Sequence, residues 1–144
     1  MNSRILVTVA FAGLLGCRGA DGPPSSAAAS PETLGGAWVG HVSEGIAYEV
    51  CMSVPLDLSR PGSIKYFGGI SCGGSLQYQG ATGAIHTFSE TLTFGNLTNG
   101  GKCADTGRIE ATINSDGSMQ WQWFQPGSKA VQVAGVLRRQ SQCP

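Results

Sequence analysis

The alternation of apolar and polar residues restricts the fold of this sequence more than any other feature. From residue 46 to residue 58, one parity is apolar throughout and contains Ile46, Tyr48, Val50, Met52, Val54, Leu56 and Leu58. The other parity holds Glu49, Cys51, Ser53 and Asp57. A period of two places successive side chains on opposite faces of a β-strand. Residues 46–58 are therefore predicted to form a long strand with one apolar face.

Shorter alternating runs occupy the rest of the chain and are separated by turn residues, such as "RPG" at 60–62 and "NSDG" at 114–117. The other predicted strands contain Trp38 and Val42, Ile64 and Tyr66, Leu76 and Tyr78, Ala84 to Phe94, Ile109 to Ile113, Met119 to Phe124, and Val131 to Leu137. No window has the helical period. We expect an all-β domain, an antiparallel up-and-down meander of about seven or eight strands, closed as a small barrel or folded as a sandwich.

The first residues have the pattern of a secretory signal. Arg4 precedes an apolar run from Ile5 to Leu15, which is shorter than the roughly 20 residues that a membrane-spanning helix needs. The tetrapeptide "LLGC" at 14–17 resembles a bacterial lipobox. This resemblance implies cleavage before Cys17 and acyl chains on its thiol and its new amine, which would anchor the protein to a membrane. The alternative is a plain secretory signal with a chance cysteine.

Residues 18–34 are rich in Pro, Ser, Ala and Gly, and they contain no large apolar side chain before Leu34. Such a segment cannot bury enough surface to order itself. We therefore expect a signal peptide at 1–16, a lipidated cysteine and flexible tether at 17–34, and a single barrel-like domain at 35–144. Arg18 stands where lipoproteins of the inner membrane carry aspartate. The expected location is the cell envelope, outside the cytoplasm, and the outer membrane if the source is Gram-negative.

Charge and cysteine content narrow the functional classes. Nine basic and nine acidic residues form no basic stripe, so we expect no nucleic-acid partner. Besides Cys17, the chain has Cys51, Cys72, Cys103 and Cys143. An even number of cysteines in an oxidising compartment predicts two disulfides. Because the cysteines and histidines are not clustered, no metal site is expected, and no sequence feature indicates a cofactor.

Several short motifs occur in the order of a known domain. They are "LGGAWVG", "YEV", "SCGGSL", "FSETLTFG", "CADTGRIEATINSDGSMQWQW" and "AGVLRR". Over roughly residues 36–139, the chain resembles a bacterial extracytoplasmic β-domain. That domain occurs in secreted or lipid-anchored proteins and as a tail of some actinobacterial receptor-like serine/threonine kinases. The resemblance implies a fold and a location, and it implies no activity.

The same resemblance bears on the disulfides. The two cysteines that recur in the domain match Cys72 and Cys103, which implies a Cys72–Cys103 bond and leaves Cys51 with Cys143. A hairpin of 75–80 with 84–94 would place Cys72 and Cys103 beyond the same end. The rival pairing, Cys51–Cys72 with Cys103–Cys143, is also within reach, because strand 46–58 turns back toward residue 72.

The stretch "GISCG" at 69–73 matches the Gly-x-Ser-x-Gly pattern of hydrolases with a serine nucleophile. That motif needs a helix after the turn, with a histidine and an acid behind it. The sequence that follows, "GSLQYQ", reads as a strand instead. We therefore interpret the glycines as turn residues beside Cys72, and we expect Ser71 not to be catalytic.

Glu90 is the more informative residue, because it shares a parity with Phe88, Leu92 and Phe94 and is therefore expected to point inward. A buried carboxylate must be paired, hydrogen-bonded or neutralised. Glu90 could meet an inward arginine or backbone amides, or a bulge could turn it outward. Alternatively, Glu90 and His86, which has the same parity, line a ligand pocket.

The aromatic residues allow two interpretations: they form core, or they stack on a ligand such as a sugar or peptide. These residues are Trp38, Tyr66, Tyr78, Trp121 and Trp123. The leading hypothesis is a lipid-anchored, non-catalytic binding module of the cell envelope with a protein or glycan ligand. The alternatives are an inhibitor of a cell-wall-degrading enzyme, a structural envelope protein and, last, a small hydrolase.

Overall fold

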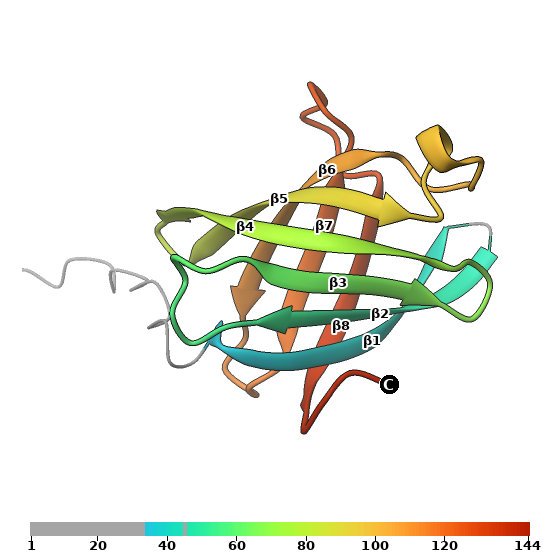
Figure 1. Cartoon of the computed structure of the whole chain (residues 1–144). Coiled ribbons are helices and arrows are strands. Elements are labelled where there is room, and N and C mark those ends of the chain that lie inside the picture. The colour runs from blue at the N-terminus through green and yellow to red at the C-terminus, as the bar shows by residue number, and fades with distance from the viewer. Residues whose placement is uncertain (1–33, 45) are drawn as a thin grey trace, which may run out of the picture.

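Eight antiparallel strands form a closed barrel in the computed structural model, which describes residues 34–44 and 46–144 (Figure 1). The strands are β1 (Gly36–Glu44), β2 (Ile46–Val54), β3 (Gly62–Phe67), β4 (Cys72–Thr82), β5 (Ile85–Phe94), β6 (Thr106–Ile113), β7 (Met119–Phe124) and β8 (Val133–Gln140). A short 3-10 helix, η1 (Leu97–Asn99), lies between β5 and β6. Each strand pairs with its neighbours in sequence, and β1 pairs with β8 to close the barrel. The predicted all-β meander is confirmed, with closure as a barrel and not as a sandwich.

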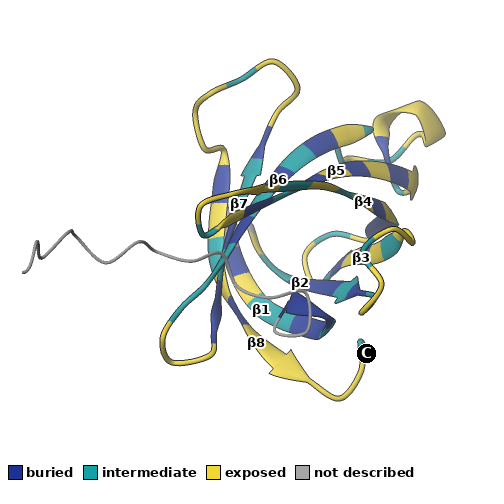
Figure 2. Cartoon of the chain, turned by 90° about the vertical axis from the view of Figure 1, so that its left-hand side faces the viewer, coloured by how far each residue is buried: buried dark blue, intermediate teal, exposed yellow. Residues whose placement is uncertain are grey.

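Alternation along the strands separates the interior from the surface. On β5, His86, Phe88 and Glu90 are buried, whereas Ile85 and Ser89 are exposed. Figure 2 shows the strands as a ring in which buried and exposed positions alternate. The largest buried side chains are the indoles of Trp38 and Trp121, so the interior is filled mainly by apolar and aromatic groups. In the part of the chain that the structure describes, no helix is long and apolar enough to cross a membrane.

The strand predicted over residues 46–58 is shorter in the structure. It ends at Val54, and Leu56 beyond it is 69% exposed. Pro55 explains the difference, because it has no N–H to donate to the ladder between β2 and its neighbours. The apolar alternation continues past the proline, but only its first part forms the strand.

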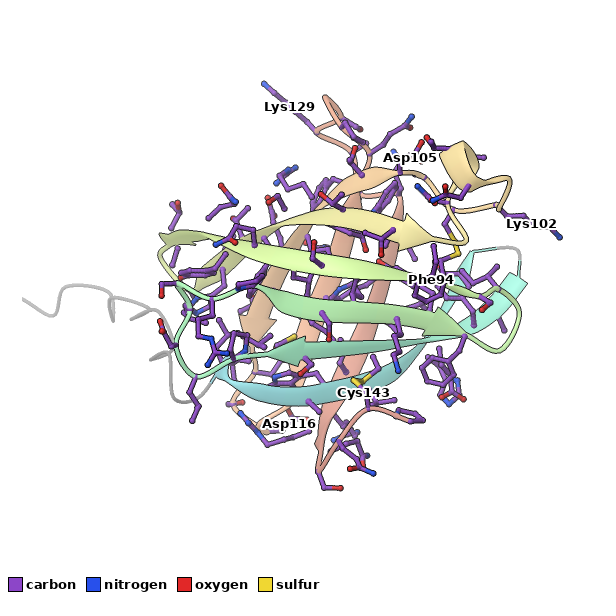
Figure 3. All side chains as sticks on the ribbon, viewed as in Figure 1. Phe94, Lys102, Asp105, Asp116, Lys129 and Cys143 are labelled. Carbon is purple, nitrogen blue, oxygen red and sulfur yellow. A yellow bond between two sulfur atoms is a disulfide. The ribbon has the colours of Figure 1, made fainter. Side chains whose placement is uncertain are left out.

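Two disulfides join Cys72 to Cys103 and Cys51 to Cys143. This is the pairing that the resemblance implies, and the rival pairing is not formed. Cys51 has the outward parity of β2, so its bond to Cys143 holds the C-terminal residues against the outside of the barrel (Figure 3). Cys72 and Cys103 are 31 residues apart in sequence, and Cys51 and Cys143 are 92 residues apart. Cross-links of this span contribute roughly 3.5–5 kcal/mol each in the chain-entropy model.

The barrel has two different ends. One end, called here the N-terminal end, carries the start of β1 and the turns β2–β3, β4–β5 and β6–β7. The opposite end, called here the mouth, carries the connections β1–β2, β3–β4, β5–β6 and β7–β8. In Figure 1 the helix η1 marks the mouth.

Leu34 belongs to the folded domain, although the sequence analysis assigns it to the tether. Its side chain is fully buried in the core, and its carbonyl accepts a 2.8 Å hydrogen bond from the indole N–H of Trp38. The predicted signal peptide, Cys17 and the tether up to residue 33 lie outside the described residues.

Candidate functional site

A cavity of about 290 Å³ occupies the interior of the barrel at the mouth. Its walls come from strands β2, β3, β5, β7 and β8 and from the two connections that carry Ile70 and Lys102. The lining residues are Tyr48, Tyr66, Ile70, Glu90, Leu92, Lys102, Cys103, Ala104, Trp121, Trp123 and Val133. Ligand pockets in proteins typically measure about 300–1,000 Å³, and an eight-stranded barrel is wide enough to hold one small ligand. The cavity therefore has the size of a site for a small molecule.

Glu90 places a carboxylate in the wall of this cavity and is only 2% exposed. The hydroxyl of Tyr66 donates a hydrogen bond to Oε1, and the indole N–H of Trp123 donates one of 2.7 Å to Oε2. Glu90 points inward, as its parity suggests. Its partners are side-chain donors from β3 and β7, and not the arginine or backbone amides that the sequence analysis considered.

The environment of Glu90 acts on its pKa in two directions. Burial raises the pKa of the carboxyl, and the hydrogen bonds from Tyr66 and Trp123 partly oppose that rise. Burial also raises the pKa of Tyr66 well above its usual value, with a further contribution from the charge of Glu90. Over residues 34–44 and 46–144, the ion pairs are His41–Glu49 and Arg108–Glu110. Glu90 thus has no ion-pair partner among the described side chains.

Gly107 makes room for the hydrogen bond between Trp123 and Glu90. It lies directly opposite Glu90 in the β5–β6 register. A Cβ atom on residue 107 would overlap Nε1 of Trp123 and would lie 2.8 Å from Oε2 of Glu90. Sequence reasoning missed this residue. Its only signal is a glycine at an inward position of an alternating strand, which is typical of close approach by another group.

His86 lies away from this cavity. It is buried on β5 toward the N-terminal end, opposite Ala81, and it is not among the residues that line the cavity. Its Nδ1 is 3.0 Å from the hydroxyl of Tyr78, and burial lowers the pKa of the imidazole. The structure therefore separates His86 from Glu90, with which the sequence analysis had grouped it.

Ser71 also lies far from His86. It is an exposed residue in the β3–β4 connection at the mouth, and strand β4 follows it directly. His86 pairs with Ala81 near the other end of that strand. With a rise of about 3.3 Å per residue, the ten residues from Ser71 to Ala81 span roughly 30 Å along the strand. Ser71 and His86 therefore cannot form a nucleophile and base within one domain.

The aromatic residues divide between the core and the cavity. Tyr48, Tyr66, Trp121 and Trp123 line the cavity. The rings of Tyr48 and Tyr66 pack edge to face with centroids 6.0 Å apart, and Tyr66 packs in the same way on Trp121 at 6.4 Å. Among the described residues, the indole N–H of Trp121 is buried without a hydrogen-bond partner. Four aromatic side chains and one buried carboxylate therefore line the same cavity.

Two of the four connections at the mouth, β3–β4 and β5–β6, are called here the rim, and a second hollow of about 370 Å³ lies between them. It is lined by residues of the β3–β4 and β5–β6 connections, from Gly68 to Cys72 and at Gly95, Gly101 and Lys102. The connections approach closely because Gly95 has a φ of +67° and its missing side chain leaves room for the carbonyl of Ser71. The Cys72–Cys103 bond joins the same two segments.

The β5–β6 connection is held in place by side-chain hydrogen bonds in addition to the disulfide. Asp105 Oδ1 accepts hydrogen bonds from the side chain of Asn96 at 2.6 Å and from the backbone N–H of Thr98 at 3.0 Å. These bonds, the backbone N–H of Thr98 first, lower the pKa of Asp105. Figure 3 shows Asp105 and Lys102 beside η1, with the Lys102 side chain pointing away from the barrel.

Comparisons with models of protein families, with curated proteins and with solved structures found no match. A search of the described residues for three or more clustered metal-ligating side chains found no group.

Proposed function

We propose that the protein is a lipid-anchored, non-catalytic binding protein of the cell envelope that holds a small ligand in the mouth of its barrel. The observation that carries the proposal is the cavity of about 290 Å³ with a hydrogen-bonded carboxylate in an aromatic wall. Ligand sites are typically apolar hollows with a few well-placed polar groups. The cavity at the mouth has this composition.

The position of the mouth is consistent with an N-terminal anchor. The chain enters the barrel at Leu34, at the end opposite the mouth. A lipid on Cys17 would therefore hold the N-terminal end toward the membrane and leave the mouth facing away from it. This orientation would suit capture of a ligand from the surrounding compartment.

The proposal can be tested by blocking the mouth. Ala104 lines the cavity, so Ala104→Trp should fill it, whereas Ala81→Trp adds the same side chain to an exposed position near the N-terminal end. The purified mature protein and both variants are dialysed to equilibrium against a small-molecule extract of the source cells, and retained compounds are identified by mass spectrometry. Wild type and Ala81→Trp should retain a compound that Ala104→Trp does not. Identical retention by all three proteins would reject a ligand site in the mouth.

A second candidate function is contact with a protein partner through the rim. Phe94 and Leu97 are 47% and 61% exposed on the β5–β6 side of the mouth. Exposed apolar side chains on an ordered loop are typical of an interaction surface. This candidate includes the hypothesis that the protein inhibits a cell-wall-degrading enzyme.

A further inference from the structure

The mouth cavity combines a carboxylate with aromatic side chains, and this combination restricts the chemistry of its ligand. The inference below rests on the proposed function, because it names the class of ligand for the same site. From the geometry we infer that the cavity binds a small organic cation, with an ammonium group beside Glu90 and an apolar body against the surrounding rings.

The hydrogen bonds of Glu90 favour its ionised form. An indole N–H can only donate, so Oε2 of Glu90 must act as an acceptor toward Trp123. Oε1 accepts from the hydroxyl of Tyr66. A carboxylate offers about four lone-pair sites, so two donors leave acceptor capacity for a third partner. A ligand ammonium group could use that capacity.

A cationic ligand would also supply the charge that the site lacks. Burial of an ionised carboxylate carries a cost that hydrogen bonds offset only in part, and a positive charge beside it reduces that cost further. Lys102 lines the rim, but its side chain is exposed and points outward in Figure 3. Neither ion pair of the described residues includes Glu90. Since these side chains leave Glu90 unpaired, its counter-charge would come from the ligand.

The aromatic side chains of Tyr48, Tyr66, Trp121 and Trp123 supply the apolar part of the site. Tyr66 and Trp123 turn their polar edges, a hydroxyl and an N–H, toward Glu90, so the preference for a cation comes from the carboxylate. The rings offer apolar surface to the body of the ligand. The cavity volume of about 290 Å³ limits the ligand to a small molecule.

Three probes of one shape and different charge can test the inference: benzylammonium, benzyl alcohol and benzoate. Binding to the mature protein is followed by isothermal titration calorimetry and by tryptophan fluorescence, to which Trp121 and Trp123 of the cavity contribute. Benzylammonium should bind about ten-fold or more tightly than benzyl alcohol, the scale of a charge-assisted hydrogen bond, and benzoate should bind most weakly. Equal binding of the three probes, or no binding of benzylammonium, would overturn the inference.

Two variants separate the roles of charge and shape. Glu90→Gln keeps the side chain's size, and its amide can still accept from Trp123 and donate to Tyr66. It should remove the preference for benzylammonium over benzyl alcohol. Lys102→Ala should leave that preference intact or enlarge it. If Lys102→Ala abolished binding and Glu90→Gln did not, the site would be an anion site and the inference would be wrong.

The dependence of benzylammonium binding on pH tests independently whether Glu90 is the partner of the cation. Tyr48, Tyr66 and Lys102 are the other titratable side chains of the cavity. Benzylammonium, a primary ammonium ion, stays protonated at acidic and neutral pH. Its affinity should therefore rise with pH as Glu90 ionises in the wild type and stay constant in Glu90→Gln. A constant affinity in both proteins would count against Glu90 as the cation's partner.

The outcomes distinguish this inference from the proposed function. Suppose that Ala104→Trp abolishes retention of a neutral or anionic compound in the dialysis experiment, and that benzylammonium shows no advantage. The mouth would then be a ligand site, and only its preference for cations would be rejected.

Discussion

Trp123 donates its indole N–H to Oε2 of Glu90 at 2.7 Å, and this bond links β7 to β5 across the inner face of β6. The strand between them contributes Gly107, whose missing side chain leaves the space that the bond occupies. Three adjacent strands thus fix one carboxylate in the wall of the mouth cavity. The predictions below test this arrangement and the anchoring of the domain.

Gly107→Ala should break the bond between Trp123 and Glu90, because the added methyl group would overlap the indole nitrogen. We expect a loss of about 2–4 kcal/mol in the free energy of unfolding, from overpacking and a lost buried hydrogen bond. Urea unfolding measures the change. In a Trp123→Phe background the same substitution should cost less, because the smaller ring relieves the overlap. Equal costs in both backgrounds would argue against the proposed coupling.

Glu90→Gln should change how stability depends on pH. The pKa of Glu90 is raised in the folded state, so the folded protein binds this proton more tightly than the unfolded chain does. As pH rises from about 4.3, the usual value of glutamate, through the raised pKa, wild type should lose stability relative to the variant. Above the raised pKa the difference should be constant.

The difference between the two proteins is the quantity to measure, by urea unfolding at a series of pH values. Asp57, Asp105 and Asp116 have lowered pKa values, so their stabilising contributions are lost on acidification. These contributions are common to both proteins and cancel in the difference. A wild type that gained stability over the variant with rising pH would show that the hydrogen bonds outweigh burial.

The two disulfides should have different effects on the mouth. Replacing both cysteines of either pair by alanine should lower the free energy of unfolding by roughly 3.5–5 kcal/mol. Only loss of Cys72–Cys103 should alter the mouth, because Cys103 lines the cavity and Cys51–Cys143 lies on the outer wall. Quenching of tryptophan fluorescence by acrylamide should therefore increase in the first variant. Equal increases in both double variants would contradict the placement of Cys72–Cys103 at the mouth.

Thiol labelling of the denatured, unreduced wild type should find no free thiol.

Cys17→Ser should leave the protein unprocessed or soluble, because the predicted lipobox ends at Cys17 and would no longer direct lipidation. Fractionation of cells into membrane and soluble parts, followed by immunoblotting, measures the effect. Normal membrane retention of the variant would refute the predicted anchor.

Leu97→Ser tests the rim as a surface for a protein partner. Leu97 is 61% exposed at the mouth, and Leu56 is 69% exposed at the N-terminal end, so Leu56→Ser is a matched control. Neither change should alter the melting temperature by much, since both side chains lie in solvent. If the rim binds a partner, pull-down from solubilised envelope should lose it with Leu97→Ser alone. Loss with neither variant would reject this contact.

The alternation of apolar and polar residues by itself determined the class of fold and, for most strands, which residues face the interior. Because the side-chain period of a strand is two, the pattern places Tyr66, Phe88 and Trp121 inside without any tertiary information. It also places Glu90 inside. The even number of cysteines likewise predicted two disulfides, although the residues alone left two pairings open.

Only the tertiary structure decided what surrounds Glu90. Tyr66 and Trp123 are 24 and 33 residues away in sequence, and their distance from the carboxylate depends on the closure and tilt of the barrel. The same parity placed His86 inside, yet its position along β5 puts it near the other end. The parity of a residue predicts which face of its strand it lies on, but not its position along the barrel axis. That position, together with the space left by Gly107, decides whether an inward side chain lines the cavity or packs in the core.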